Sequence, residues 1–151
     1  MSMTWVEHED GSPAKGRLDI GWSLKPPQGS DGKYGRLEAI NLATGETLWM
    51  KRDRHIPSSS MLATGGGLLF SGNADRRFRA LDDRNGNVLW ETRLSAVPNA
   101  TPITFAVSGK QYVAIAAGGG GAHDVDTIEL TPEMLRSAHA TTLMVFALRS
   151  T

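Results

Sequence analysis

The sequence contains no cysteine, which excludes disulfides, thiolate nucleophiles and metal sites built on cysteine. It also has no excess charge, because 16 Lys and Arg balance 16 Asp and Glu. Proteins that bind nucleic acid draw affinity from surplus basic residues, so we expect no nucleic-acid partner. No apolar run approaches about 18 residues, so we expect no membrane-spanning segment. The first residues lack the basic and apolar pattern of a signal peptide.

What the chain of 151 residues does contain is an internal repeat with an offset of 41 residues. Residues 34–53 and 75–94 share six identities over twenty aligned positions. Each unit predicts a β-hairpin, because large and small residues alternate before a turn glycine and β-branched or aromatic residues follow it. A tryptophan at a fixed distance from that glycine can lie flat over a neighbouring backbone, as in a tryptophan-docking motif. The positions that we assign a structural role are the pairs Ala39 and Ala80, Gly45 and Gly86, and Trp49 and Trp90.

Further apolar segments predict more strands at 67–72, 101–107, 111–117 and 142–148. Units of about 40 residues with four short strands are typical of β-propeller blades. We therefore expect a single all-β domain over 1–151, a partial propeller of about three four-stranded blades. The predicted blades cover residues 4–52, 60–94 and 99–149, and the third lacks an outer strand, for which we suggest Thr4–His8.

Residues 118–140 interrupt the strand pattern and predict an inserted loop. Thr131 followed by Pro132 and Glu133 predicts one short helix in this loop, with proline at its first position. His123, Asp124 and Asp126 are candidate ligands of a divalent ion, or else solvated charges of a loop. A site for a hard ion needs about six oxygens, and no dense acidic loop supplies them, so the second interpretation is favoured.

Three arginines, at positions 76, 77 and 79, form a small basic group. Strand alternation places Arg77 and Arg79 on one face, which we expect to be solvent-exposed. The aspartates that we expect to balance these charges are Asp75, Asp82 and Asp83.

Taken together, these segments resemble the C-terminal blades of quinoprotein alcohol and sugar dehydrogenases, which depend on pyrroloquinoline quinone (PQQ). The resemblance covers roughly residues 34–149. It is carried by Ala63-Thr-Gly-Gly66, the Ala80…Gly86…Trp90 motif, Gly109-Lys-Gln-Tyr-Val-Ala114, the glycines at 118–121 and the closing strand that ends at Leu148.

The resemblance implies an eight-bladed propeller, usually periplasmic, with PQQ and Ca²⁺ at its centre. In that family a catalytic Asp acts as base while a hydride passes from the alcohol to the quinone. The catalytic Asp and most metal ligands lie in earlier blades of the family, so we assign no catalytic residue and no metal ligand here. The cofactor-facing loops of the family correspond to Gly120, Gly121, His123 and Ser60.

At two positions where the family often has a tryptophan, this chain has none, and both positions concern PQQ binding by this chain alone. The family often places a Trp before the Ala-Thr-x-Gly-Gly stretch, where this chain has residues 55–60 without an aromatic side chain. A second Trp often follows the glycine-rich segment, where Ala122 and His123 stand.

Two functions of different classes follow. The first is a piece of a PQQ-dependent dehydrogenase, catalytically incomplete alone, which oxidises an alcohol or sugar in its complete form. The alternative is a non-catalytic propeller module that acts as an oligomeric scaffold. A further possibility is a protomer that rebuilds a cofactor site at an oligomer axis. Open blade edges carry unpaired backbone groups, so we expect homo-oligomers.

Overall fold

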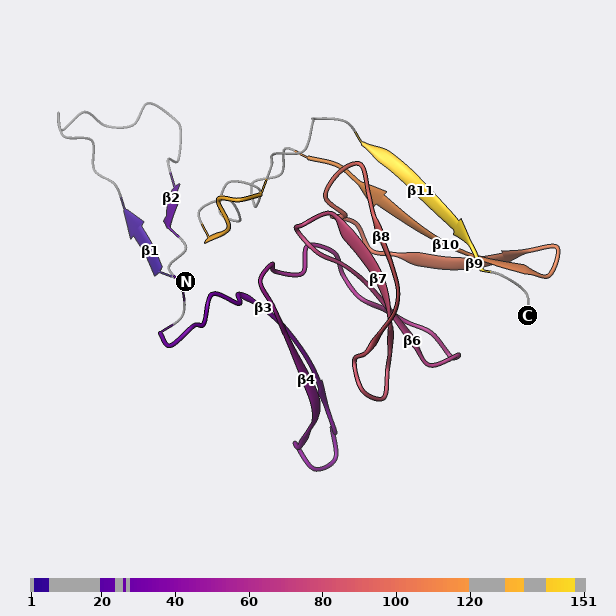
Figure 1. The fold of residues 1–151 in the computed structure, drawn as a ribbon, viewed down its shortest axis with the longest axis horizontal. Helices are drawn as coiled ribbons and strands as arrows, with labels where there is room; N and C mark the ends of the chain where they lie inside the picture. The colour runs from indigo at the N-terminus through magenta and orange to yellow at the C-terminus, as the bar shows by residue number, and fades with distance from the viewer. Residues whose placement is uncertain are drawn as a thin grey trace.

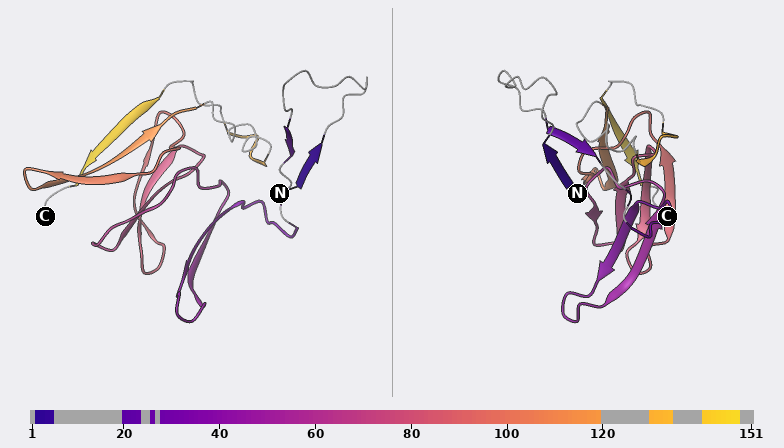
Figure 2. Two further views of the ribbon diagram at one scale, coloured as in Figure 1. Left: turned by 180° about the vertical axis from the view of Figure 1, so that it is seen from behind. Right: turned by 90° about the vertical axis from the view of Figure 1, so that its left-hand side faces the viewer.

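The computed structural model describes residues 2–5, 20–23, 26, 28–119, 130–134 and 141–148. In this part the strands pair only in the antiparallel sense and form four sheets of two, two, four and three strands. The last three sheets fan out beside one another in chain order (Figures 1 and 2). This arrangement confirms the all-β prediction and is consistent with a partial β-propeller. The strands are β1 (Ser2–Trp5), β2 (Ile20–Ser23), β3 (Gly35–Ile40), β4 (Thr47–Asp53), β5 (Leu62–Ala63), β6 (Leu68–Gly72), β7 (Arg77–Asp82), β8 (Val88–Arg93), β9 (Ile103–Val107), β10 (Lys110–Ala117) and β11 (Thr142–Ala147).

The four-stranded sheet has the order β5-β6-β7-β8 and forms the centre of the fan. In its register Phe70 lies opposite Ala80, and Ser71 lies opposite Arg79. Because side chains alternate along a strand, the first pair shares a face with Phe78 and the second pair occupies the other face. The sheet therefore presents one apolar face and one face that carries a buried arginine.

The three-stranded sheet has the order β11-β10-β9 and packs on the apolar face of the central sheet. Val113 and Ile115 of β10 are each 1% exposed, and Met144 and Phe146 of β11 pack against the same core. The alternate residues of β9 and β11 lie on the opposite face of this sheet and are exposed.

An aromatic cluster joins these two sheets, with the fully buried Phe78 at its centre. Its ring centroid lies 5.9 Å from Phe70, 6.1 Å from Trp90 and 5.9 Å from Phe146. Trp90 and Phe146 also meet edge to face at 5.1 Å. Stacked and edge-to-face pairs at these separations add stabilisation beyond their buried area.

The predicted first blade, residues 4–52, is divided in the structure. Its strands form two separate sheets, β1 with β2 and β3 with β4, rather than one four-stranded sheet. The suggestion that Thr4–His8 completes the third blade is also not what the described part shows, because Ser2–Trp5 pairs with β2. Residues 6–8 lie outside the described residues. A partner strand nearby in the chain closes a shorter loop, at lower cost in entropy, than a partner at the other end of the chain.

The predicted helix in the insertion falls mostly outside the described residues. Residues 131–134 form a turn, in which the Met134 amide donates to the carbonyl of Thr131 at 2.9 Å. Across the part of the chain that the structure describes, no helix has the length and apolar character needed to cross a membrane.

Replacing Phe78 should test the aromatic cluster. We expect Phe78→Ala to lower the free energy of unfolding by about 3–5 kcal/mol, because it leaves a cavity between two sheets. Phe105→Ala removes the same atoms from a side chain that is 38% exposed, and should cost about 1 kcal/mol. Urea denaturation measures both, and similar losses for the two variants would contradict the assigned core.

Candidate functional site

A narrow cleft lies between the β3–β4 hairpin and the face of the central sheet that carries Arg79. Gly35 and Leu37 of β3, Asp53 of β4, and Ser71 and Arg79 of the central sheet contribute to its walls. The space that it encloses is about 20 Å³, which is room for about one water molecule. The cleft is therefore a seam between two sheets rather than a pocket for an organic ligand.

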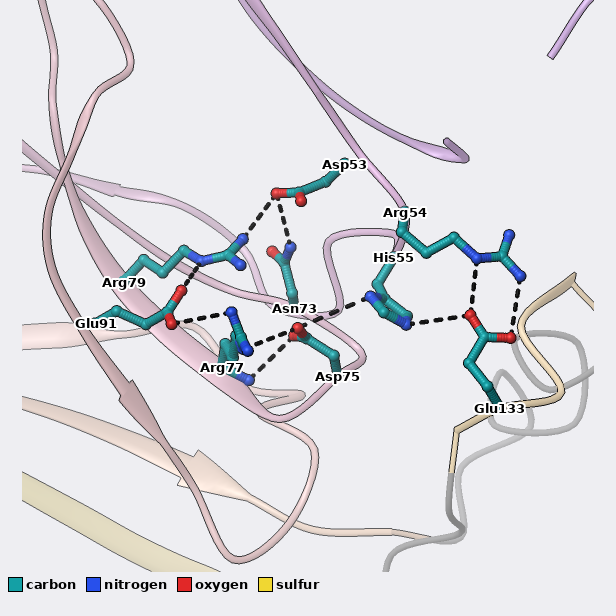
Figure 3. Close-up of polar contacts among 9 residues, drawn as sticks. All are labelled: Asp53, Arg54, His55, Asn73, Asp75, Arg77, Arg79, Glu91 and Glu133. Carbon is teal, nitrogen blue, oxygen red and sulfur yellow. Dashed lines mark hydrogen bonds and ion pairs between the residues drawn. The ribbon is translucent and has the colours of Figure 1, made fainter. Parts of the chain in front are cut away.

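Arg79 is the central polar residue of this seam and is only 8% exposed. Its Nη1 donates to Oδ2 of Asp53 at 2.7 Å, and its Nε donates to Oε2 of Glu91 at 2.6 Å (Figure 3). Asn73 donates to the same Asp53 oxygen at 3.4 Å. Burial alone would lower the pKa of the guanidinium, but the hydrogen bond to Glu91 and the charges of both carboxylates raise it above its usual value. Arg79 thus stays charged and ties β4 to β8 through β7.

The chain of charges continues outward from Glu91. Oε1 of Glu91 lies 3.0 Å from Nη1 of Arg77, and Nε of Arg77 lies 3.3 Å from Oδ2 of Asp75. The same Asp75 oxygen lies 3.8 Å from Nδ1 of His55. His55 lies two residues after the end of β4, so the network returns to the β3–β4 hairpin.

At its outer end the network reaches the turn at 131–134. Nε and Nη2 of Arg54 donate to the two carboxylate oxygens of Glu133, at 2.7 and 3.0 Å. Nε2 of His55 lies 3.6 Å from the same carboxylate (Figure 3). The hydrogen bond from Arg54 holds the pKa of Glu133 below its ordinary value. A two-point fork of this kind fixes direction as well as distance between two segments.

The chemistry of this network is structural. Each carboxylate that it contains is paired with a guanidinium or lies beside His55, so none is a free general base. Among the described residues, no buried side-chain nitrogen or oxygen lacks a partner, and no group of three or more acidic or histidine side chains is placed to hold a metal ion.

The two repeated hairpins match in detail. The register shifts after Ala39 in the first hairpin and after Ala80 in the second. Gly45 and Gly86 both adopt positive φ, at 76° and 71°, and each donates its amide to the residue four positions before it. Glycine suits these turns because left-handed backbone is costly for residues with a Cβ.

Trp49 and Trp90 occupy different surroundings despite equivalent places in their hairpins. Nε1 of Trp49 donates to the carbonyl of Asp83 at 2.8 Å, and its ring covers Gly86 so closely that an added Cβ would lie 2.8 Å from the ring. Trp90 instead packs in the aromatic cluster. The turn glycine of the next unit, Gly109, has no atom within 4 Å of the Cβ position.

The structure places only one of the four predicted cofactor-binding residues. Ser60 is exposed in the loop before β5 and does not line the cleft, and its carbonyl accepts a hydrogen bond from Ser59. Gly120, Gly121 and His123 lie outside the described residues, as do the candidate metal ligands Asp124 and Asp126.

Sequence reasoning misplaced Arg79 and missed its partners. Arg77 and Arg79 share a face, as predicted, but Arg79 is buried rather than in solvent. The carboxylates on Arg79 are Asp53 and Glu91, whereas Asp82 bonds to Arg84. The repeat alignment held a usable signal, because pairing Ala80 with Trp90 sets Arg79 opposite Glu91. No pattern in the sequence indicated that the β3–β4 hairpin would cover and bury Arg79.

Comparison with known proteins identifies the family. Residues 4–113 match the model of the PQQ family, described as the β-propeller domain of glucose, ethanol and alcohol dehydrogenases. The chain belongs to this family. The fold and the resemblance inferred from the sequence are thereby confirmed.

Individual PQQ-family relatives agree with this assignment. The 1-butanol dehydrogenase (cytochrome c) of Thauera butanivorans is 34% identical over 122 residues, which are 77% of this chain and 17% of that protein. The quinoprotein ethanol dehydrogenase of Pseudomonas aeruginosa is 32% identical over 115 residues, 76% of this chain and 18% of that protein. The known structure of a europium-containing methanol dehydrogenase superposes on this chain with a TM-score of 0.70 and 29% sequence identity. The match covers 81% of this chain and 24% of that protein's chain. The chain thus spans about a fifth of the length of the curated relatives that it matches.

The described residues do not by themselves fit the cofactor of the PQQ family. PQQ is a fused three-ring quinone with three carboxylates, and a seam with room for about one water cannot hold it. No reaction step is therefore assigned to the residues of the seam.

A pair of glycine variants should test the contact between Trp49 and Gly86. Gly45→Ala introduces a Cβ into left-handed backbone and should cost about 1–2 kcal/mol. Gly86→Ala adds a clash with the Trp49 ring and loss of the hydrogen bond to Asp83, so it should cost about 1 kcal/mol more. Urea denaturation compares them, and equal losses would mean that Trp49 does not depend on the bare glycine.

The charge network should make stability depend on pH in acid. Burial favours a higher pKa for Glu91, but the hydrogen bond from Arg79 and the charges of Arg79 and Arg77 outweigh it and lower the pKa below 4.5. The resulting stabilisation is present above pH 4.5 and is lost as the pH falls through the lower pKa of the folded state. Glu91→Gln should therefore reduce stability at neutral pH and flatten its fall in acid. Urea denaturation at several pH values in this range measures the effect. If the free energy of unfolding falls in parallel with pH for the wild type and Glu91→Gln, the prediction is wrong.

Proposed function

We propose that this chain forms part of the propeller of a PQQ-dependent dehydrogenase and that the complete enzyme oxidises an alcohol or a sugar. The family match over residues 4–113 carries this proposal. The printed names of its relatives include dehydrogenases of 1-butanol, ethanol, methanol and glucose. Since those proteins are several times longer, the activity belongs to the complete enzyme, and we infer that this chain is catalytically incomplete alone.

We further infer that the Trp49 contact is the tryptophan dock between consecutive blades. The ring spans from one hairpin to the turn of the next unit, and that turn has the glycine that leaves space for it. In this interpretation the described residues set the angle between blades, while the chemistry depends on other residues.

We propose that the cofactor contacts Gly120, Gly121, His123 and Ser60, the residues that the family resemblance indicates. In the sequence, Gly120, Gly121 and His123 precede the 131–134 turn, in which Glu133 accepts hydrogen bonds from Arg54, the residue after β4. Ser60 lies in the loop after β4. Ca²⁺ is part of the same proposal, with ligands that we do not assign, and a periplasmic location remains a prediction from the family resemblance.

Titration with PQQ, with and without Ca²⁺, should test this site through quenching of tryptophan fluorescence. We expect saturable, Ca²⁺-dependent quenching and no dye-linked oxidation of alcohols or sugars by the chain alone. His123→Ala should weaken the response by about tenfold, equivalent to one lost hydrogen bond. His139→Ala is the matched control and should leave it unchanged. Absence of a saturable response would remove the cofactor site from this chain and leave the blade architecture.

A second candidate is a self-associating propeller module without catalysis. The observation that favours it is the exposed sheet end of the fan, where β9 and β11 are both edge strands and neither contains a charged residue. Natural proteins usually protect such edges with charge, proline or a covering segment, since they template pairing with other chains.

A further inference from the structure

The turn between β7 and β8 contains Asn85 directly before Gly86, and an asparagine followed by glycine occurs once in this sequence. Such a pair is prone to lose the side-chain amide without an enzyme, because glycine has no Cβ to hinder attack by its own backbone nitrogen. Asn85 is exposed, as are Arg84 and Asn87 on either side of the pair. The turn therefore presents the reactive side chain to water, which the reaction consumes.

The side chain of Asn85 is already directed toward the peptide that would attack it. Its Oδ1 accepts a hydrogen bond from the backbone amide of Asn87 at 2.8 Å. A side chain bonded two residues ahead folds over the peptide between them, so the carboxamide lies along the Gly86 peptide. The same hydrogen bond polarises the carboxamide carbonyl, which makes its carbon a better electrophile.

The backbone nitrogen of Gly86 is held back by two contacts. Its amide donates to the carbonyl of Asp82 at 2.9 Å, which retains the proton that must leave before the nitrogen can attack. The Trp49 ring covers Gly86 so closely that an added Cβ would lie 2.8 Å from the ring, and Nε1 of Trp49 donates to the carbonyl of Asp83 at 2.8 Å. Gly86 is buried although Asn85 is exposed. The electrophile is thus accessible while the nucleophile is covered by the preceding hairpin.

We propose that Asn85 is a site of spontaneous deamidation whose rate is controlled by the contact of Trp49 with Gly86. When this contact opens, the Gly86 nitrogen loses its proton to solvent base and attacks Cγ of Asn85. A C–N bond forms, the side-chain nitrogen takes a proton from solvent and leaves as ammonia, and a five-membered succinimide results. Water then opens the ring at either carbonyl and gives aspartate or isoaspartate. The reaction transfers no electrons and is independent of any cofactor or partner.

The two products should affect the turn differently. Aspartate keeps the length of the main chain and adds a charge near Asp82, which already pairs with Arg84. Isoaspartate carries the main chain through its former side chain and lengthens it by one carbon immediately before Gly86. Because one added carbon at Gly86 would already clash with the Trp49 ring, this displacement opposes renewed contact. Isoaspartate should therefore leave the β3–β4 hairpin separated from the β7–β8 turn.

The internal repeat supplies a matched control for the turn. Thr44 stands before Gly45 at the place that Asn85 has before Gly86. The two glycines have similar φ, 76° and 71°, and each donates its amide to the residue four positions before it. Threonine fits this backbone and has no carboxamide, so it cannot form a succinimide. Asn85→Thr should therefore preserve the turn and abolish the reaction.

Incubation of the chain in mildly alkaline buffer, followed by mass spectrometry of the tryptic peptide 85–93, measures the reaction against an unincubated baseline. We expect slow conversion of Asn85 in the folded wild type and conversion at least about tenfold faster in urea, since local opening limits the folded chain. Trp49→Ala should accelerate the reaction severalfold, and Asn85→Thr should show none. Asn87 lies in the same peptide before a β-branched valine, and fragment ions should show it unchanged.

Trp49→Phe keeps a ring over Gly86 but loses the hydrogen bond to Asp83, so its rate should fall between those of wild type and Trp49→Ala. It preserves the test if circular dichroism shows that Trp49→Ala does not fold. Equal rates for folded wild type, Trp49→Phe and the chain in urea would overturn control by Trp49. No conversion of Asn85 in urea would overturn the site itself.

A comparison of the two products tests the consequence. Asn85→Asp carries the new charge on an unchanged main chain and should unfold in urea close to the wild type. The chromatographically separated isoaspartate form should unfold at lower urea than Asn85→Asp. Equal midpoints for the two would show that the lengthened main chain does not disturb the contact of Trp49 with Gly86, and would contradict the proposal that this contact and the reaction oppose each other.

Discussion

The burial of Phe78 between two sheets is the contact on which the arrangement of this protein depends. Its ring meets three other aromatic rings from β6, β8 and β11, so a single side chain joins the central sheet to the sheet that follows. Close backbone packing supports the same junction, because a Cβ on Gly72 would overlap Pro98. Once this contact fixes one face of the central sheet, strand alternation leaves Arg79 and its neighbours to meet the first hairpin on the other face.

That second junction is held in a different way. The β3–β4 hairpin contacts the central sheet through the Trp49 ring on Gly86 and through the ion pairs of Arg79, rather than through a continuous apolar core. Directional bonds fix geometry well but contribute modest net stability, whereas buried apolar area contributes most of it. The hairpin should therefore open at lower free energy than the two sheets joined by Phe78, which gives the fan a rigid half and a more compliant half.

How far the sequence predicts this structure depends on the range of the interactions involved. The 41-residue repeat predicts the matching bulges after Ala39 and Ala80 and the positive φ of Gly45 and Gly86, because local turn chemistry determines them. The burial of Arg79 is not predictable in this way, since it requires Asp53 from a hairpin 26 residues away to lie over it. The predicted first blade fails to form one sheet for a similar reason, as strand pairing beyond a hairpin depends on distant contacts. The candidate cofactor residues gain no support from the described geometry, because only Ser60 falls within it.

Family membership offers a physical reason for the exposed apolar face of the sheet β9-β10-β11. Every blade of a propeller covers its neighbour, so an apolar sheet face is what a member of the PQQ family requires wherever another blade follows. A neighbouring blade in the same polypeptide acts at an effective concentration of about millimolar, well above any second copy at micromolar concentration. A blade joined to the same polypeptide would therefore occupy this face in preference to a second copy. The exposure of Leu143 and Val145 is thus what blade-on-blade packing requires of a propeller strand, and it does not call for a separate partner to explain it.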